Sequence, residues 1–457
     1  MADFVAIVLA AGKGTRMKST LPKVLHEVGG KPMVKHVLDA AKASGSTRNI
    51  LVIGFGGERV REVVGSDAEY KVQVEQLGTG HAVLETRDML ADYDGTVMVL
   101  CGDTPLLDEK LLTKLFFEHR NAGAQATVLT AIMPNPNGYG RVIRDQTGRV
   151  VKIVEQKDAT PDELLVCEIN TGIYCFESKT LFSLLSGITC DNAQGEYYLT
   201  DVIGMMVCGG GKVWAVAADD YQKTMGINSR AQLAEAEGIL RQHKLTRLMD
   251  SGVTIMDLNS TFIDEEVNIA PDVIIYPFTW LEGKTTIGTG SVIGPNVRFT
   301  DTVVGENVTV HFTYAHQCRL CNNITVGPYV HLRPGTVLAD NVKVGNFVEV
   351  KNTNVGIGSK IPHLSYVGDT DMGARVNIGS GTITVNYDGT HKHRTIIEDD
   401  AFIGCNTNLV APVSVGKGAY VAAGSTITKN VPSEALGVAR ARQNNIADWT
   451  TKHKGRK

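Results

Sequence analysis

The feature that most constrains how this chain folds is an apolar residue at every sixth position in its second half. A period of six fits neither the 3.6-residue turn of an α-helix nor the two-residue alternation of a plain strand. It predicts a hexapeptide β-helix, in which short strands form the sides of a prism and each coil stacks about 4.8 Å from the last. Three separate series hold the period, which disfavours a β-sandwich with irregular turns. The series are Ile269, Ile275, Leu281, Ile287, Ile293 and Phe299; Val326, Leu332, Leu338, Val344 and Val350; and Ile397, Ile403, Leu409, Val415, Val421 and Ile427.

Small residues also recur at a fixed place within this period. Four residues after many of the apolar positions stands a small or β-branched residue, such as Thr285, Ser291 or Thr407, which we expect at the corners of the prism. The period breaks twice, around residues 311–324 and again in TVNYDGTHKHRT, residues 384–395. Because segments that leave a repeat scaffold often build its site, we expect functional residues in such places.

The first half of the chain follows a different pattern, in which apolar strands alternate with amphipathic helices. This order predicts a mostly parallel sheet with helices on its faces, whose ligands bind beyond the carboxyl ends of the strands. We therefore expect an α/β domain (1–228), a linker helix (229–250) and a β-helix domain with a C-terminal tail (251–457). The predicted strands are Val5–Ala10, Ile50–Ile53, Val97–Cys101 and Ala126–Ile132, and the predicted helices are Pro32–Ser44, Gly80–Leu90 and the connector Ser229–Met249.

Length, charge and cysteine usage exclude several classes of protein. The 457 residues are too many for one core, and the formal net charge of −4 gives no general reason to bind nucleic acid or an anionic membrane. No apolar run reaches the roughly 18 residues of a membrane span, and the first residues lack the basic leader of a signal peptide. The cysteines are scattered, with one CxxC at Cys318–Cys321, so we expect reduced thiols rather than zinc. Together these observations predict a cytoplasmic protein. The basic stretch Lys452–Lys457 is predicted to form a solvated, poorly ordered tail.

The first predicted strand leads into a loop whose composition suggests phosphate binding. Residues 8–25 read VLAAGKGTRMKSTLPKVL, so glycines and cations directly follow a strand. The loop matches neither GxxxxGK[ST] nor GxGxxG, because Met17 stands at the last glycine position. What remains is a glycine turn that lets backbone N–H groups approach an anion, supported by Arg16 and Lys23. An ordinary strand–helix turn with surface cations is the alternative, and Asp103, which ends a strand in the sequence CGD, argues against it.

Three cations stand out in the second half, which is otherwise rich in Gly, Val, Ile and Asn: Arg333, Lys351 and Lys392. Taken alone, each is better explained as a solvated surface residue. Arg333 and Lys351, however, each directly follow an inward apolar residue and lie 18 positions apart, which is three sides of six. We therefore expect them one coil apart on one edge of the prism, where they can hold a phosphate together with the hydroxyl of Tyr366.

Short motifs in both halves carry a family resemblance that covers nearly the whole chain. The first half contains LAAGKGTRM, LPKVL, EQLGTGHA (75–82), CGD (101–103), GYGR (138–141), VEQKDA (154–159), EINTGI (168–173) and GINSR (226–230). The second half contains LRPG (332–335), VGNFVEVK (344–351), HLSYVGD (363–369), NIGSGTITVNYDG (377–389) and VAAGS (421–425). The first set resembles sugar-1-phosphate nucleotidyltransferases, and the two together resemble the bifunctional family of N-acetylglucosamine-1-phosphate uridyltransferases and glucosamine-1-phosphate acetyltransferases. The resemblance implies a Rossmann-like nucleotidyltransferase domain, a left-handed parallel β-helix and a homotrimer.

For the first half, the resemblance implies attack of a sugar phosphate on the α-phosphate of UTP, with release of pyrophosphate. We expect Arg16 and Lys23 at the leaving phosphates, and Asp103 and Asn228 as ligands of Mg²⁺, an ion that prefers oxygen donors. The other implied substrate-binding residues are Leu9, Ala10, Ala11, Gly12, Gln73, Gly78 and Thr79 at the nucleotide, and Gly140, Glu155, Asn170 and again Asn228 at the N-acetylhexosamine and ribose.

For the second half, the resemblance implies that acetyl-CoA acetylates glucosamine-1-phosphate before the uridylyl transfer. His363 is the expected base, because an amine must lose a proton before it attacks a thioester, and a neutral imidazole takes that proton near pH 7. The residues implied at the amino sugar phosphate are Arg333, Glu349, Lys351, Tyr366, Asn377 and Lys392. Those implied at acetyl-CoA are Ser380, Asn386, Tyr387, Cys405, Ala423 and Arg440, where Ser380 replaces a common alanine and Cys405 a common serine.

The implied partners are small molecules: glucosamine-1-phosphate, N-acetylglucosamine-1-phosphate, UTP and acetyl-CoA, with Mg²⁺ as cofactor and neither nucleic acid nor membrane insertion. Two other functions stay open at this point. One is a single-activity sugar-1-phosphate nucleotidyltransferase whose β-helix only regulates or oligomerises it. The other is a trimeric binding scaffold with degenerate sites. The joint presence of Asp103, Asn228 and His363 favours the bifunctional enzyme.

Overall fold

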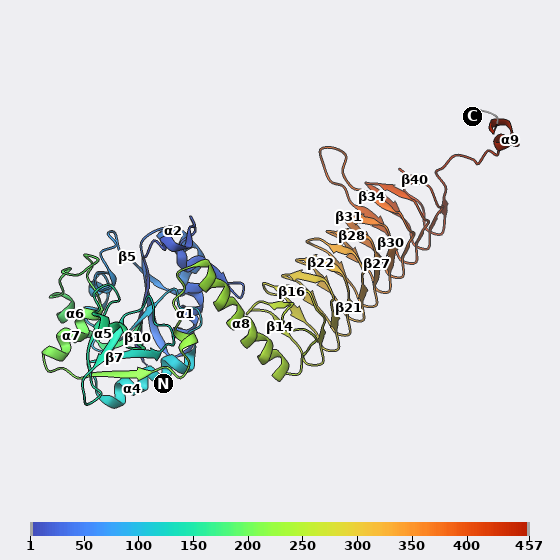
Figure 1. Cartoon of the computed structure of the whole chain (residues 1–457). Coiled ribbons are helices and arrows are strands. Elements are labelled where there is room, and N and C mark those ends of the chain that lie inside the picture. The colour runs from blue at the N-terminus through green and yellow to red at the C-terminus, as the bar shows by residue number, and fades with distance from the viewer. Residues whose placement is uncertain (1–2, 455–457) are drawn as a thin grey trace. The chain divides into compact units, whose positions relative to one another are not determined.

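The computed structural model describes residues 3–454 and contains an α/β unit and a β-helix (Figure 1). The two compact units divide between Leu240 and Arg241, inside helix α8 (Arg230–Asp250). The finer division at residues 228 and 250 stays a prediction. Within residues 3–454, no helix is long and apolar enough to cross a membrane.

The α/β unit is built on a mixed sheet. In spatial order its main strands are β11 (Val213–Ala217), β7 (Ala126–Ile132), β10 (Glu168–Glu177), β6 (Thr96–Cys101), β1 (Phe4–Ala10), β4 (Ser46–Ile53) and β5 (Glu69–Val72). β1 pairs in parallel with β4 and β6, and β7 with β11, whereas β10 lies antiparallel between β6 and β7. A hairpin of β8 (Arg141–Arg144) and β9 (Val150–Val154) joins β10. The sheet is therefore mostly parallel, as predicted, with one reversed strand near its centre.

Helices cover both faces of this sheet. They are α1 (Met33–Ala43), α2 (Gly57–Val64), α3 (Thr79–Leu84), α4 (Glu109–Ala122), α5 (Pro161–Leu164), α6 (Ser178–Leu185) and α7 (Thr200–Cys208). Alternate residues of β1 enter two separate cores, because successive side chains of a strand point to opposite faces. Ala6 and Val8 pack with α1 and α4, while Val5 and Ile7 pack with α3, α6 and α7.

Two helix predictions for this unit need correction. The helix expected over residues 32–44 is α1, but Pro32 is its N-cap and does not lie in its first turn. The prediction of one helix over Gly80–Leu90 is wrong, because α3 ends at Leu84 and a separate 3₁₀ turn follows at Arg87–Leu90. Thr86 lies between the two, and its hydroxyl donates to the carbonyl oxygen of Val83 at 2.7 Å. Such a local side-chain bond offers the backbone an alternative to continuing the helix.

The second unit is a three-sided parallel β-helix that runs from β12 (Thr254–Ile255) to β41 (Leu436–Gly437). Its strands form three parallel sheets of 11, 10 and 9 strands, one on each side of the prism. The predicted inward residues are buried in one continuous core. The predicted corner residues are buried as well, and Thr285 and Thr407 each donate a hydroxyl hydrogen bond of 2.7 Å to the carbonyl three residues earlier. A small polar side chain therefore satisfies the backbone where it turns.

The sides of the prism are not all six residues long. Leu332 pairs with Val350, 18 residues on, whereas Val304 pairs with Leu320, only 16 residues on. The period does break around residues 311–324, as predicted, but the chain does not leave the scaffold there. β22 (Thr313–His316), β23 (Arg319–Leu320) and β24 (Thr325–Val326) continue the three sheets without interruption. The corners lose residues while the strand pairing is kept, so the period shifts although the chain never leaves the scaffold.

The second predicted break is confirmed. Residues 386–394 form a loop that leaves the prism between β34 (Ile383–Val385) and β35 (Thr395–Ile397), and it projects from the scaffold in Figure 1. Tyr387 and Lys392 pair across this loop as an isolated antiparallel bridge. The loop therefore has a hairpin-like base that presents its residues beside the outer surface of the prism.

A helix lies at each end of the second unit. At the first coil, Leu245 and Leu248 of α8 join the core, and the Lys244 ammonium donates to two backbone carbonyls at 2.8 Å. At the far end, Lys452 and His453 belong to a short helix, α9 (Trp449–His453), so this part of the predicted tail is helical. Lys454 follows as the C-cap of this helix, and residues 455–457 of the predicted tail lie outside the described residues.

Candidate active sites

A cavity of about 610 Å³ opens in the α/β unit near the carboxyl ends of β1 and β6, where the fold predicts ligands. The predicted residues that line it are Leu9, Ala10, Ala11, Gly12, Lys23, Gln73, Gly78, Thr79 and Asp103. The residues that sequence reasoning missed are Lys13, Val24, Gln76, Ala82, Cys101 and Glu196. Most of these stand inside or beside the motifs quoted above, so the motifs were sufficient to find them, whereas Glu196 comes from a segment without any such signal.

The loop after β1 is shaped by one glycine. Gly14 has φ +59, in the left-handed region that glycine enters without strain, and a Cβ there would lie 2.6 Å from the Cβ of Lys23. Glycine at this position therefore lets Lys23 pack beneath the loop and reach the cavity. Arg16, in the 3₁₀ turn Thr15–Met17, is exposed and makes no hydrogen bond or ion pair within the described chain. Its guanidinium is thus available for a ligand.

Lys23, Asp103 and Asn228 form the charged centre of this unit. The Lys23 ammonium pairs with the Asp103 carboxylate and donates to the amide oxygen of Asn228 at 3.0 Å. Two oxygen donors that converge on one cation fit the predicted Mg²⁺ ligands, since that ion takes few protein ligands and completes its shell with water and phosphate oxygens. In residues 3–454, no group of three or more His, Cys, Asp or Glu side chains is arranged to hold a metal.

The first turn of α3 forms another wall of the cavity. Its N-cap, Gly78, has φ +116, and a Cβ there would lie 2.6 Å from the carbonyl oxygen of Tyr197, so only glycine fits. The Gln73 amide nitrogen donates to the Gly78 carbonyl and contacts the ring of His81, each at 3.0 Å. The Gln73 side chain is therefore held in place by its nitrogen, and its carbonyl oxygen is left for a ligand.

Gly140, Glu155 and Asn170 form a second group around β8, β9 and β10, and they do not line the 610 Å³ cavity. The Asn170 backbone N–H donates to the Gly140 carbonyl at 2.9 Å, and a Cβ on Gly140 would lie 3.4 Å from a carboxylate oxygen of Glu155. Burial, together with the nearby carboxylates of Asp158 and Asp201, raises the pKa of Glu155. The structure thus brings these three predicted residues together.

Cys101, at the end of β6, is a lining residue without nucleophilic character. Burial, reinforced by the neighbouring Asp103 carboxylate, raises the pKa of its thiol to about 12. The thiol also donates to the carbonyl of Gly172 at 3.5 Å. Because a thiolate is needed for attack, Cys101 shapes the cavity and is not a candidate nucleophile.

In the β-helix, a row of predicted residues lies along one corner of the prism. The ladder pairs Lys343 with Lys360, Lys360 with Asn377, Asn377 with Phe402 and Phe402 with Tyr420. The residues three positions further on therefore stack on successive coils, about 4.8 Å apart. We call this row the His363 column, and it consists of Asn346, His363, Ser380, Cys405 and Ala423.

The His363 column joins the predicted base to the predicted coenzyme residues. It is closely packed at the backbone, because a Cβ on Gly379 would lie 2.5 Å from the Cys405 nitrogen and one on Gly404 would lie 2.5 Å from the Ala423 nitrogen. Arg440 lies at the far end, with its Cδ 3.9 Å from a Cβ built on Gly424. The corner therefore presents a continuous row of closely stacked positions, which suits an extended ligand.

His363 lies exposed in β30 (Lys360–His363), and its Nδ1 is 2.6 Å from the amide oxygen of Asn346 in β27 (Lys343–Asn346). An amide oxygen only accepts, so in the neutral ring Nδ1 carries the proton and Nε2 has the lone pair. This tautomer is the one that a base acting through Nε2 needs. Sequence reasoning quoted Asn346 inside VGNFVEVK but gave it no role.

The predicted phosphate-binding residues lie at the next corner of the prism, which we call the Lys351 corner. The pairing of Leu332 in β25 (Val330–Leu332) with Val350 in β28 (Val348–Lys351) places Arg333 and Lys351 one coil apart, as predicted. Arg333 pairs with Glu349 at 2.9 Å. The proximity of Lys351 lowers the pKa of Lys392, so the loop brings its cation next to the corner.

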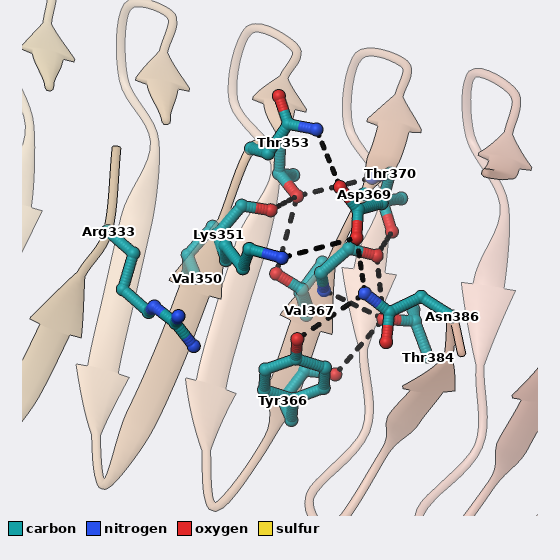
Figure 2. Close-up of polar contacts among 12 residues, drawn as sticks. Arg333, Val350, Lys351, Thr353, Tyr366, Val367, Asp369, Thr370, Thr384 and Asn386 are labelled. Atoms are coloured by element: carbon teal, nitrogen blue, oxygen red, sulfur yellow. Dashed lines mark hydrogen bonds and ion pairs between the residues drawn. The ribbon is translucent and has the colours of Figure 1, made fainter. Parts of the chain in front are cut away.

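Tyr366 and Asn386 complete this group. Tyr366, in β31 (Tyr366–Gly368), is the ladder partner of Glu349, and the Asn386 amide nitrogen lies 3.4 Å from its hydroxyl (Figure 2). Tyr387 is exposed and donates its hydroxyl to the Gly389 carbonyl at 2.6 Å. The His363 column and the Lys351 corner thus flank one face of the prism, the face that carries Glu349 and Tyr366.

The folds and sites of the two units define a two-domain transferase. The sequence profile of the family described as "Nucleotidyl transferase" matches residues 5–226, and that of "Bacterial transferase hexapeptide (six repeats)" matches residues 394–429. The hexapeptide match and the parallel ladders identify the prism as a left-handed parallel β-helix. This hand departs from the right-handed rule for ordinary βαβ crossovers.

Comparison with curated proteins identifies the family. The chain is 52% identical to the "Bifunctional protein GlmU" of Geobacillus sp. (strain WCH70) over 97% of each chain. It is 54% identical to the protein of that name from Heliobacterium modesticaldum over 98% of each chain, and 49% identical to that of Brevibacillus brevis over 100% of each. The chain belongs to the bifunctional GlmU family and is an enzyme with two transferase activities. This result disfavours both the single-activity enzyme and the scaffold without activity.

Proposed function

We propose that the β-helix acetylates glucosamine-1-phosphate with acetyl-CoA, and that the α/β unit then joins N-acetylglucosamine-1-phosphate to UTP, giving UDP-N-acetylglucosamine and pyrophosphate. The observation that carries the proposal is the assembly of two different polar sets in one chain. Asp103 and Asn228 converge on a cation in the first unit, and the His363 column runs along a corner of the second.

In the α/β unit, an oxygen of the sugar phosphate would attack the α-phosphorus of UTP while the bond to the pyrophosphate oxygen breaks. A phosphate monoester is mostly dianionic above pH of about 6, so this nucleophile needs no base. The chain's own work is therefore positioning and charge neutralisation. Lys23 and Arg16 would meet the leaving phosphates, and the backbone of Leu9–Gly12 would hold the nucleotide against Gln73.

Asp103 and Asn228 would hold Mg²⁺ in this site. When bound, the ion would neutralise part of the charge that accumulates on the triphosphate in the transition state. Lys23 contacts both oxygens, so a lysine that moves onto a substrate phosphate would leave them to the metal. This arrangement lets one carboxylate and one amide serve a cation in both states.

In the β-helix, the Nε2 atom of His363 would take a proton from the ammonium group of glucosamine-1-phosphate. The amine nitrogen would then bond to the acetyl carbonyl carbon, the C–S bond would break, and the CoA thiolate would leave and regain a proton. Arg333, Lys351 and Lys392 would hold the sugar phosphate. The His363 column would support the coenzyme, with Asn377 facing the amino sugar and Arg440 at the far end.

A homotrimer would complete the acetyltransferase site. The face between the His363 column and the Lys351 corner has a groove of about 500 Å³ with exposed aromatic side chains. Tyr329 and Phe347 stack there, with ring centroids 5.2 Å apart. We propose that a second copy of this chain covers the face, since it lies between the two halves of the site. Sedimentation of the full chain should give a trimer, and a fully active monomer would contradict the shared site.

The direct test of the proposed function is mass spectrometry of an incubation with glucosamine-1-phosphate, acetyl-CoA, UTP and Mg²⁺. We expect N-acetylglucosamine-1-phosphate first and UDP-N-acetylglucosamine second. Omission of UTP should stop the sequence at the acetylated sugar phosphate. If only supplied N-acetylglucosamine-1-phosphate is converted, the β-helix has no acetyltransferase role. All four substrates are small, soluble metabolites, which fits action in the cytoplasm.

A further inference from the structure

Asp369 lies at the centre of a polar cluster that joins the Lys351 corner to the loop 386–394 (Figure 2). Its side chain is only 7% exposed. One carboxylate oxygen accepts from the Asn352 amide nitrogen at 2.5 Å. The other accepts from the Asn386 amide nitrogen and lies 3.6 Å from the Lys351 ammonium. Two residues of the proposed acetyltransferase site therefore meet on one oxygen of a buried acid.

Four other aspartates at corners of the β-helix bond to the backbone, whereas Asp371, like Asp369, bonds to side chains. Asp264, Asp301, Asp340 and Asp399 each accept a hydrogen bond from a backbone N–H of a neighbouring coil. Those carboxylates satisfy the turning backbone, which is a structural task. The side-chain bonds of Asp369 go to other side chains, and its neighbours Lys351 and Asn386 are both predicted to contact substrates. The position of Asp369 thus calls for more than a structural explanation.

The charge of Asp369 fixes which way the Asn386 amide faces. Burial favours the neutral acid, but the bonds from Asn352 and Asn386 and the charges of Lys351 and Lys392 outweigh it and hold the pKa of Asp369 below its usual value. An ionised carboxylate only accepts hydrogen bonds, so it binds the nitrogen of Asn386 and turns the carbonyl oxygen of that amide away from itself. The oxygen is then the atom that Asn386 offers to a ligand.

Asp369 also supplies the negative charge beside two neighbouring cations. Lys351 lowers the pKa of Lys392, which shows that the two ammonium groups repel one another at close range. The Asp369 charge acts in the opposite direction on Lys392 and pairs directly with Lys351. The Arg394 guanidinium, whose own carboxylate partner is Asp371, lies nearby as well. The Asp369 carboxylate therefore pairs with Lys351 and offsets part of the repulsion between Lys351 and Lys392.

We infer that Asp369 is a positioning residue of the acetyltransferase site, which holds Lys351 in place and orients Asn386 so that its carbonyl oxygen faces the substrates. The inference rests on the proposed function. It assigns Asp369 no contact with the reacting atoms. Its effect on catalysis passes through the two residues that it holds.

The test compares four full-length variants with the wild type: Asp369→Asn, Asn386→Asp, the double exchange of both, and Asp340→Asn as a matched corner control. Asp369→Asn keeps the side-chain volume, but its amide N–H group must then face one of the two amide donors, Asn352 or Asn386. Misplaced binding groups commonly lower rates by up to about 100-fold, so we expect acetyl-transfer kcat/KM to fall about 10- to 100-fold. Uridylyl transfer and the melting temperature should stay near those of the wild type. Asp340→Asn should acetylate normally.

The exchange distinguishes positioning from a merely structural role. Asn386→Asp places two carboxylates together, and one must take a proton before they can bond. Its activity relative to the wild type should therefore rise as the pH is lowered from 8 to 6. The double exchange restores a donor opposite an acceptor, so it should lose this acid dependence and recover at least about 10-fold over Asp369→Asn.

Several results would overturn the inference. One is Asp369→Asn acetylating within twofold of the wild type. If that variant does not fold, the exchange decides, and a double exchange no more active than Asn386→Asp at every pH also refutes the role. A wild-type chain that does not acetylate glucosamine-1-phosphate at all would instead refute the proposed function.

Discussion

The two units of this chain assemble their polar groups in opposite ways. In the α/β unit, Lys23, Asp103 and Asn228 come from distant parts of the sequence and meet because loops gather at one edge of a sheet. In the β-helix, Asn346 and His363 meet because they hold equivalent positions on adjacent coils. A sheet edge collects unlike residues around one point, whereas a stacked repeat spreads like positions along a line. The first design suits a compact nucleotide site and the second an extended ligand.

The difference also determines what each site depends on. The α/β cavity is enclosed by loops of one unit, so its geometry depends on individual backbone turns such as that at Gly78. The β-helix site depends on strand pairing, which keeps the residues of the His363 column stacked although the coils that carry them differ in length. The predictions below test whether the two sites are as separate as their construction indicates.

The largest effect is expected for His363→Ala. Loss of the base that takes the ammonium proton should lower acetyl transfer by about 10²- to 10⁴-fold. Uridylyl transfer to supplied N-acetylglucosamine-1-phosphate should be unchanged. A coupled assay of CoA release measures the first reaction, and pyrophosphate release measures the second. His316→Ala, which removes another histidine of the β-helix, is the control, and normal acetylation by His363→Ala would place the base elsewhere.

The next largest effect is expected for Asp103→Ala. Removal of this carboxylate should lower uridylyl transfer by at least about 10²-fold, because charge neutralisation carries most of phosphoryl-group catalysis. Acetyl transfer should not change. Asp219→Ala, which removes an exposed carboxylate paired with Lys114, is the control. EDTA should reproduce the selective loss in the wild type, and an equal loss of both activities would point to a structural metal.

A backbone change should separate strain from helix propensity within the α/β unit. Gly78→Ala introduces a Cβ 2.6 Å from the Tyr197 carbonyl oxygen at φ +116, which should destabilise the unit by about 3 kcal/mol and impair uridylyl transfer. Gly238→Ala, in the middle of α8 with open space around it, should instead stabilise by about 0.5–1 kcal/mol. Denaturant melts of the two variants provide the comparison, and equal effects would show that the turn at Gly78 is not tightly fitted.

The last of these predictions concerns pH and the α/β unit alone. His119 is 2% exposed, and burial lowers its pKa to about 4. The unfolded chain binds a proton at this residue below pH 6.5 while the folded chain does not, so stability is full above pH 6.5 and falls as the pH drops toward 4. Between pH 7 and pH 5 the loss is about 2 kcal/mol.

Calorimetry of the full chain at pH 7 and pH 5 measures this loss, with residual uridylyl transfer marking the α/β unit. His119→Gln cannot titrate, and it keeps a group able to hydrogen-bond Thr127, which the histidine ring contacts at 2.9 Å. The variant should therefore show a smaller change of melting temperature between the two pH values than the wild type. An unchanged difference would mean that His119 titrates alike in both states.

The sequence was sufficient to predict the prism because its core is a local pattern. Within each of the three periodic series, an inward position such as Leu281 or Ile403 is separated from the next by six residues. The same reasoning found the break of the period around residues 311–324 but not its cause, because coils that are two residues shorter shift the period without disturbing the ladder. Periodicity records where residues fall in the chain and does not record how a corner turns.

The sites were less predictable, because their partners are set by tertiary pairing. Asp103 and His363 are recognisable within motifs, yet nothing local in the sequence indicates that Asn346 fixes the tautomer of His363. The same is true of Asp369, which ends the quoted motif HLSYVGD but acquires its partners from adjacent coils. Residues that act through other residues leave little trace in a single sequence.

The most direct test of two separate sites in one chain is to mix Asp103→Ala with His363→Ala in one tube. Glucosamine-1-phosphate, acetyl-CoA, UTP and Mg²⁺ are supplied, and UDP-N-acetylglucosamine is followed by mass spectrometry. Each variant alone should make little of it. The mixture should make it readily, because Asp103→Ala supplies the acetylated sugar phosphate and His363→Ala uridylylates it after diffusion. A mixture as inactive as its components, although each retains its other activity, would contradict independent sites.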